Sequence, residues 1–242
     1  MHSAMDRRGV LRAMVCGASG ALLASPAHAW LRPPRYLFEA ARAALGPTPG
    51  FHVVVTGRVR GDGGPDAARA FTARWVFDRA AARLEVAVNG PQGATAAWRR
   101  GGEAQGDPRL VADPLERLCL GRLFVDPPTG AGAGVPALVR DLGADVSRQR
   151  LTLLGGDVVD IVGEAPGDAP APHLAFDHDR GWLRRVAWRQ GGELSVYELS
   201  GWLRAGGPSG VAFPRAARLT RGGRWLCTWE SALPKPLAGR TP

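Results

Sequence analysis

The sequence predicts an α+β protein built on a single curved antiparallel β-sheet, an incomplete barrel that wraps a few helices. From Phe51 onward, short runs alternate apolar and polar residues with a period of two, which is typical of strands with one buried face. Glycine pairs at 155–156, 191–192 and 222–223 separate several of these runs, and such pairs favour tight turns between antiparallel neighbours. Consecutive hairpins in one sheet are therefore expected.

The first 29 residues are typical of a secretion signal. Arg7 and Arg8 precede an apolar run over residues 10–24, and Ala27 and Ala29 form an A-x-A cleavage site before Trp30. The paired arginines approximate the twin-arginine export pattern, and the general export route stays open as the alternative. The apolar run is too short to span a bilayer. We expect cleavage after Ala29 and a single periplasmic domain over residues 30–242.

The domain is expected to open with a helix over residues 35–45, because Pro33 and Pro34 start it, apolar residues recur on one face and Gly46 ends it. Period-two alternation then predicts a meander. Its strands are expected near residues 51–60, 71–78, 83–88 and 94–99, with a turn over residues 61–66.

The middle of the chain predicts two more helices. Asp113 and Pro114 are typical of a helix start and indicate a short helix over residues 114–120. A Pro/Gly loop over residues 127–134 follows, and then a helix over residues 135–142 with Leu138, Val139 and Leu142 facing inward. This loop and the helix after it are the candidate lid.

The remainder returns to strands and turns. The alternating runs fall at residues 151–154, 158–162, 174–176, 183–188, 194–199, 211–213, 217–220 and 225–230.

Composition excludes some classes of function. The formal net charge is +9, yet Lys235 is the only lysine and the arginines are spread along the chain, so with an export signal present no nucleic-acid partner is expected. Attraction to acidic lipid headgroups stays open.

Cys119 and Cys227 remain after cleavage, and either a disulfide or two buried thiols is compatible with an oxidising compartment.

The usual catalytic motifs are missing from the sequence, which has no G-x-S-x-G, H-E-x-x-H, P-loop or C-x-x-C pattern. No catalytic residue, metal or cofactor is therefore expected, and we expect a binding protein rather than an enzyme. The main alternative is a metal-dependent hydrolase built on His173, Asp177 and His178, whose side chains are of the metal-binding types. The run from Asp177 to Gly181 is equally typical of an ordinary polar turn.

Two segments carry a resemblance to a known superfamily. The first, over residues 51–99, contains V-T-G-R-V and then A-R-W-V-F-D-R-A-A-A-R-L-E-V; the second, over residues 158–221, contains V-V-D-I-V-G-E, Y-E-L-S-G-W-L and G-V-A-F-P-R-A-A-R-L-T-R-G-G. Together with the order of signal, helix, meander, helical insertion and hairpins, they resemble the outer-membrane lipoprotein carrier and sorting superfamily, LolA-like and LolB-like.

The resemblance implies a periplasmic protein that shields lipoprotein acyl chains in an apolar cavity under the sheet. It places Phe71, Trp75, Phe77, Leu84 and Val86 on the lipid-binding face. It also implies that Arg79 ties the sheet to a helical lid, although Ala80 stands where that family has proline. Lipoproteins or acyl-chain lipids are the expected partners of a monomer that contacts membrane proteins transiently. A protein-binding sensor module on the same scaffold is an alternative.

Overall fold

The chain divides into two compact units, Met1–Leu31 and Arg32–Pro242, and the second carries the fold discussed below. The structure, a computed structural model, describes residues 31–61, 64–90, 95–99, 105–106, 139, 141–164, 170–207 and 210–237. The expected signal peptide, the helix over 114–120, the loop over 127–134 and Cys119 lie outside the described residues.

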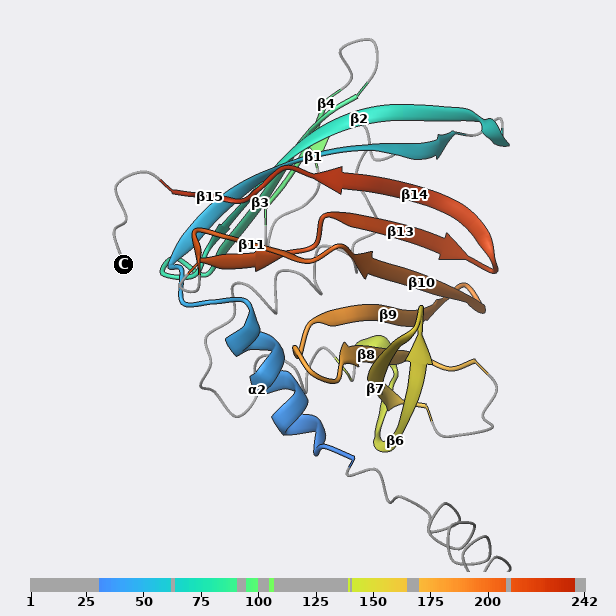
Figure 1. The fold of residues 1–242 in the computed structure, drawn as a ribbon. Helices are drawn as coiled ribbons and strands as arrows, with labels where there is room; N and C mark the ends of the chain where they lie inside the picture. The colour runs from blue at the N-terminus through green and yellow to red at the C-terminus, as the bar shows by residue number, and fades with distance from the viewer. Residues whose placement is uncertain are drawn as a thin grey trace, which may run out of the picture. The chain divides into compact units, whose positions relative to one another are not determined.

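A long antiparallel sheet is the main element (Figure 1). Its strand order is β5-β4-β3-β2-β1-β14-β13-β10-β9-β8-β7-β6, with β15 pairing with β1. The strands are β1 (Gly50–Gly61), β2 (Gly64–Asp78), β3 (Arg83–Asn89), β4 (Thr95–Arg99), β5 (Gln105–Gly106), β6 (Asp145–Leu154), β7 (Asp157–Gly163), β8 (His173–Asp177), β9 (Leu183–Gln190), β10 (Glu193–Ser200), β13 (Ala216–Arg221), β14 (Arg224–Ser231) and β15 (Lys235–Pro236). The sheet is curved and unclosed, as the sequence predicts.

Pairing of β1 with β14 joins the N-terminal meander to the C-terminal hairpins. Val55 lies opposite Ser231, and Val59 lies opposite Cys227. Every strand on the path pairs antiparallel with its neighbours, and most neighbours are consecutive in the chain. Two neighbouring pairs on the path, β1–β14 and β10–β13, are not consecutive in the chain. These two long-range pairings join separate series of hairpins into one sheet.

Helix α2 (Pro34–Ala44) confirms the predicted first helix. Pro34 occupies the first turn, where a missing N–H costs nothing, and Gly46 adopts a φ of +85° just after the helix ends. Leu37, Phe38 and Ala41 are buried and belong to the main apolar cluster. Residues 139, 141 and 142 are also helical, and Val139 and Leu142 are buried as predicted.

The two faces of the sheet differ sharply. We call inner the face that carries the main apolar cluster and contacts α2, and outer the opposite face. On β1, Phe51, Val53 and Val55 are buried while Val54 and Thr56 are exposed. On β2, alternate residues from Phe71 to Phe77 are likewise buried. The predicted period of two therefore sets which side chains enter the interior.

Three predicted boundaries are corrected. β1 reaches Gly61 and β2 begins at Gly64, so most of the turn expected over residues 61–66 is strand. β6 begins at Asp145, six positions before the predicted start, because its first half is exposed and lacks an apolar alternation. The third correction concerns the strand predicted over residues 211–213, which forms as β12 (Val211–Phe213): it pairs with β11 (Leu203–Ala205), a strand that alternation did not reveal, and this pair leaves the main sheet between β10 and β13.

Candidate functional site

The inner face carries an aromatic cluster made by residues from four strands. Phe51 stacks on Phe77 with ring centroids 4.7 Å apart, and Trp75 packs edge-on against Trp229 at 5.5 Å. Phe213 of β12 lies at the centre of the group, 5.8 Å from Phe77 and 6.2 Å from Trp229. Each of these side chains is less than 4% exposed. Such rings contribute large apolar areas and edge-on contacts to an interior.

The predicted lipid-binding residues lie together on this face. Trp75 and Phe77 belong to the aromatic cluster itself, while Leu84 and Val86 of β3 lie directly opposite Phe77 and Trp75 in the strand register. Phe71 lies at the middle of β2, where its ring packs on Gly57 of β1. All five are buried, between 0% and 8% exposed. The structure thus brings the predicted apolar set together as one continuous surface.

An apolar pocket of about 230 Å³ opens at the end of the cluster. Phe51 lines it, and the other walls come from the loop after α2, the tip of the β11–β12 pair and the C-terminal segment. These lining residues are Pro47, Thr48, Pro49, Ala205, Gly206, Gly210, Val211, Pro234 and Pro236. The pocket is smaller than the roughly 300–1,000 Å³ typical of small-molecule sites, so it suits the end of one flexible chain.

Hydrogen bonds fasten the C-terminal end of α2 beside this pocket. Arg79, at the turn after β2, donates to the Gly46 carbonyl at 2.5 Å, and Arg204 of β11 donates to the Ala44 carbonyl at 2.6 Å. The N–H of Ala212 donates to the Leu45 carbonyl at 3.2 Å. These donors satisfy carbonyls that a helix end leaves without partners, and the guanidinium charges face the negative end of the helix dipole.

The Arg79 guanidinium is largely buried in this position. Burial lowers the pKa of Arg79, and the nearby charge of Arg42 lowers it further, yet the side chain stays bonded to the helix. The resemblance implied that Arg79 ties the sheet to a helical lid; in the structure its bond is to the segment that ends α2, and most of the candidate lid over residues 127–142 lies outside the described residues. Arg204 supplies a second tie that the sequence did not reveal, because no local pattern links β11 to a helix 160 residues away.

The alternative metal constellation does not converge. His173 Nδ1 lies 2.8 Å from the Ala171 carbonyl and 3.0 Å from Glu164, whereas His178 Nδ1 lies 2.8 Å from Asp160. Asp177 accepts the N–H groups of Asp179 and Arg180 and thereby closes a turn. Within the described part of the chain, no group of three or more His, Cys, Asp or Glu could hold a metal ion.

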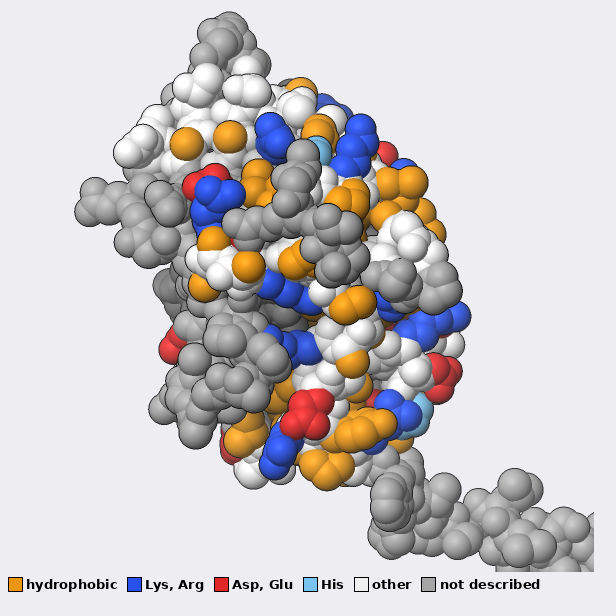
Figure 2. Space-filling view, turned by 90° about the vertical axis from the view of Figure 1, so that its left-hand side faces the viewer, with side chains coloured by type: hydrophobic (Ala, Val, Ile, Leu, Met, Phe, Trp, Pro, Cys, Tyr) orange, Lys and Arg blue, Asp and Glu red, His pale blue; other side chains and the backbone are white. Residues whose placement is uncertain are grey.

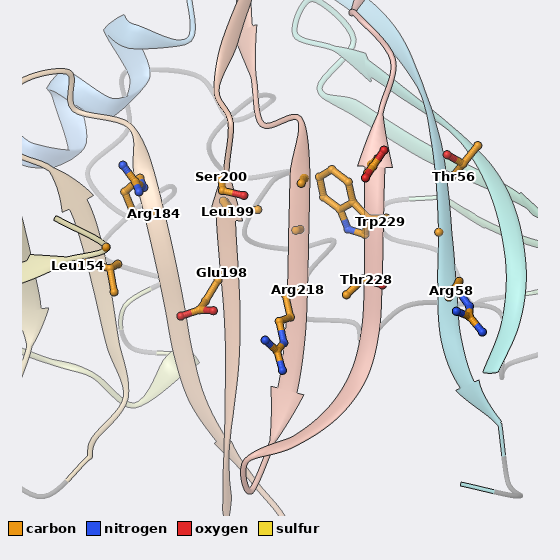
Figure 3. A pocket seen from close by; sticks show the side chains of 15 residues that line it. Thr56, Arg58, Leu154, Arg184, Glu198, Leu199, Ser200, Arg218, Thr228 and Trp229 are labelled. Carbon is orange, nitrogen blue, oxygen red and sulfur yellow. The ribbon is translucent and has the colours of Figure 1, made fainter. Parts of the chain in front are cut away.

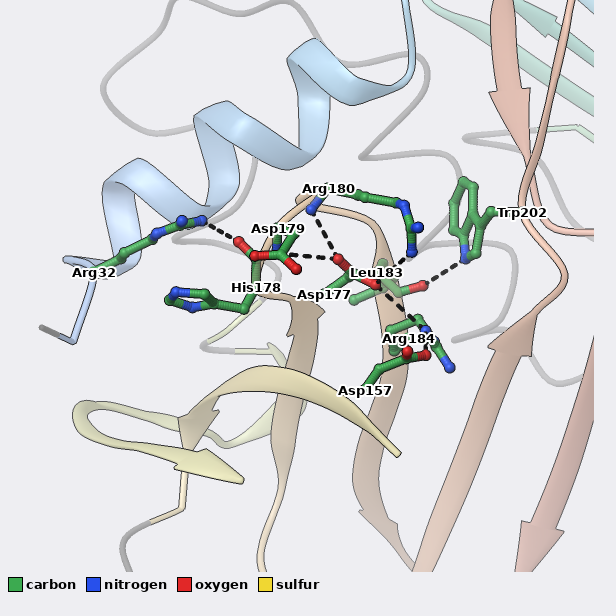
Figure 4. Close-up of polar contacts among 9 residues, drawn as sticks. All are labelled: Arg32, Asp157, Asp177, His178, Asp179, Arg180, Leu183, Arg184 and Trp202. Carbon is green, nitrogen blue, oxygen red and sulfur yellow. Dashed lines mark hydrogen bonds and ion pairs between the residues drawn. The ribbon is translucent and has the colours of Figure 1, made fainter. Parts of the chain in front are cut away.

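A polar network around Asp177 joins the β8–β9 turn to its surroundings (Figure 4). Arg184 lies 2.6 Å from Asp157 and 3.4 Å from Asp177, so it links β7, β8 and β9. Arg32, just before α2, donates to the His178 carbonyl, and Trp202 donates to the Leu183 carbonyl at 3.1 Å. This network positions the turn against the start of α2, which is a structural role.

A second recess lies on the outer face, over strands β9, β10, β13, β14 and β1. This groove, of about 760 Å³, is lined by outward side chains that include Arg58, Arg184, Glu198 and Arg218 (Figure 3). The turn between β6 and β7 bounds one end through Leu154 and Gly155. Sequence reasoning did not identify the groove, because only the pairing of β1 with β14 places these residues on one surface.

Basic side chains are spread over the face shown in Figure 2 and do not gather in one patch. This distribution matches the even spacing of arginines along the sequence.

Among the described residues, no helix has the length and apolar character needed to cross a membrane. Cys227 is buried on β14, and its predicted alternative partner, Cys119, lies outside the described residues.

These features define the class: a curved, incomplete antiparallel barrel whose apolar inner face is covered by a helix. Comparisons with solved structures agree. The fold is similar to the crystal structure of a LolA superfamily protein from Nitrosomonas europaea, at 13% identity and a TM-score of 0.50, over 87% of this chain and 96% of that one. The chain therefore has a LolA-type fold, as the sequence resemblance predicted.

A more distant likeness is to a putative outer membrane lipoprotein-sorting protein domain from Vibrio parahaemolyticus, at 10% identity and a TM-score of 0.43, over 86% of this chain and 93% of that one. No protein-family model matches the sequence, and no curated protein matches it. The likeness is thus one of fold, and the site must be argued from its own residues.

Proposed function

We propose that this protein is a periplasmic carrier or sorting protein that binds lipoprotein acyl chains on the apolar inner face of its sheet. The observation that carries the proposal is the pocket beside Phe51, because it is apolar and lies at the end of the aromatic cluster. The proposed partner is the acyl chain of a lipoprotein or lipid, with Phe71, Trp75, Phe77, Leu84 and Val86 as the binding face.

Entry of a chain requires the pocket to deepen toward Trp75. The loop after α2 and the β11–β12 tip form opposite walls, and both are attached to the end of α2 through Arg79 and Arg204. If these walls separate, Phe213 moves away from Phe77 and the chain takes its place against the cluster. In this proposal Arg79 stabilises the closed state, in which the two walls are together, because its hydrogen bond to Gly46 links the sheet to the end of the helix.

The hydrophobic effect supplies the driving force. Burying one methylene is worth about 0.8 kcal/mol, so each added methylene tightens binding roughly fourfold until the available space is filled. No covalent step is part of this function, and we propose that the protein is not an enzyme. A fatty-acid series of increasing chain length, measured by displacement of a fluorescent fatty acid, tests the relationship directly.

The pocket also offers a matched pair of variants. Ala205 lines the pocket, whereas Leu203 on the same strand is exposed and does not line it. Ala205→Phe should fill the space and weaken fatty-acid binding at least about tenfold, while Leu203→Phe should leave it unchanged. Native mass spectrometry of the wild-type protein should show bound lipid. A folded wild type that takes up no lipid or lipoprotein would refute the carrier proposal.

Export is the second part of the proposal. Cleavage after Ala29 would release a monomer that begins at Trp30, which is close to the start of α2. N-terminal sequencing of protein recovered from the periplasm tests this. A mature chain that keeps residues 1–29 would contradict it, whatever the outcome of the lipid measurements.

A further inference from the structure

The outer-face groove contains two arginines that have no partner in the described structure. Arg58 on β1 and Arg218 on β13 make no hydrogen bond or ion pair with another described residue. Three other arginines on this face are paired: Arg185 lies 2.5 Å from Glu198, Arg184 lies 2.6 Å from Asp157, and Arg150 lies 2.5 Å from Glu164. Of the three arginines that line the groove, Arg184 is therefore paired, whereas Arg58 and Arg218 are not.

The strand register places a hydroxyl between the two guanidinium groups. Thr228 of β14 is the direct partner of Arg58 on one side and of Arg218 on the other. Figure 3 shows the three side chains on adjacent strands, with Thr228 between the arginines. Neighbouring strands are separated by roughly 4.8 Å, so the two arginine backbones are about 10 Å apart, a span that two long flexible side chains can close onto one small ion.

The donor set indicates the ligand. Two guanidinium groups and one hydroxyl lie on three adjacent strands, and a phosphate group offers three strong acceptor oxygens, one more than a carboxylate. Arginine also forms bidentate pairs with phosphate oxygens. Glu198 does not oppose this charge because it is paired with Arg185. Glu230 lies two positions along β14 from Thr228 and is the one groove carboxylate that pairs with no other described residue, so its negative charge weakens the attraction for phosphate.

We propose that the groove around Arg58, Thr228 and Arg218 binds a phosphate group. This site lies on the opposite face of the sheet from the acyl-chain pocket and does not depend on it, since Arg58 and Thr228 point outward from strands whose inward residues form the apolar cluster. A phosphate carried on a lipid headgroup and a free phosphate compound would be recognised by the same donors.

The test titrates the full-length mature protein with inorganic phosphate and, separately, measures co-sedimentation with vesicles of phosphatidylcholine alone or with 30% phosphatidylglycerol added. The double variant Arg58→Gln, Arg218→Gln should weaken saturable phosphate binding about tenfold or more, the loss expected when charged hydrogen bonds are removed. Arg74→Gln is the matched control, because Arg74 is an exposed outer-face arginine on β2 that does not line the groove. Its removal should change binding less than about twofold.

Glu230→Gln provides a second readout with the opposite sign, because it removes the opposing carboxylate, and it should tighten phosphate binding. Binding to phosphatidylglycerol vesicles without saturable inorganic phosphate binding would identify a lipid headgroup as the source; the reverse would identify a free phosphate compound. The proposal is overturned if neither probe binds, or if Arg74→Gln weakens binding as much as the groove variants do, since the effect would then be one of total charge.

Discussion

The guanidinium of Arg79 donates to the carbonyl of Gly46 at 2.5 Å and thereby joins the end of β2 to the end of helix α2. The bond spans 33 residues of sequence and lies beside the apolar pocket. It couples the sheet directly to its helical cover, because one side chain bridges both.

Removing the hydrogen bond from Arg79 to Gly46 should weaken the attachment of α2 to the sheet. Arg79→Met keeps the length of the side chain but loses the charged donor, so we expect the free energy of unfolding to fall by about 1.5–3 kcal/mol and fatty-acid uptake to become faster. Urea unfolding and stopped-flow fluorescence measure the two effects. Arg35→Met is the control, because Arg35 is exposed on α2 and pairs only with Glu39. Equal effects of both variants would show that Arg79 has no special role.

The centre of the aromatic cluster should be the costliest apolar site. Phe213→Ala removes a ring that contacts Phe51, Phe77, Trp75 and Trp229, so a loss of about 3–5 kcal/mol in the free energy of unfolding is expected. Leu203, its register partner on β11, is 44% exposed, and Leu203→Ala should cost less than about 1 kcal/mol. Chemical denaturation of both variants gives the comparison. A small effect of Phe213→Ala would mean that β12 is not part of the cooperative core.

Gly57 should not tolerate a side chain. A Cβ at this position would lie 2.4 Å from the Thr228 carbonyl oxygen and 2.7 Å from the Phe71 ring. Gly57→Ala is expected to destabilise the protein by about 1–3 kcal/mol through overpacking. Thr56→Ala, at the exposed neighbouring position, should be close to neutral. Thermal unfolding distinguishes the two, and a neutral Gly57→Ala would argue against the close packing of Phe71 on β1.

Acid should destabilise the fold through His173. Burial lowers the pKa of His173, and Arg185 and Arg150 lower it further, against the raising effects of the Ala171 carbonyl and Glu164. The folded state therefore binds a proton less readily than the unfolded state, whose histidine titrates near 6.5. The contribution of His173 is fully present above about pH 6.5 and is lost as the pH falls toward its folded-state value.

The variant His173→Asn retains a donor for the Ala171 carbonyl and removes the titration. Its stability should depend less on pH below about 6.5 than that of the wild type. His52→Asn is a useful control, because burial also lowers the pKa of His52 but that side chain lies on β1, away from Glu164. If only His52→Asn flattens the profile, the assignment to His173 is wrong.

Local sequence pattern was sufficient for most of the elements. Proline before and glycine after residues 35–45 predicted α2, and alternation predicted Phe71, Trp75 and Phe77 on one buried face, because backbone geometry alone sends successive side chains of a strand to opposite sides. The alternation of apolar and polar residues is weak in strands whose side chains are mostly exposed. The exposed start of β6 and the three-residue strand β11 carry too little alternation to be read.

What belongs to the sequence alone is thus the class of the fold, the first helix and the division of each strand into inward and outward residues, since these depend on contacts between near neighbours. Only the tertiary structure decided that β1 pairs with β14, that Phe213 fills the centre of the cluster and that Arg79 and Arg204 meet the same helix end. The physical reason is that pairing and side-chain convergence between residues far apart in the chain depend on how the whole sheet curves. No local period carries that information.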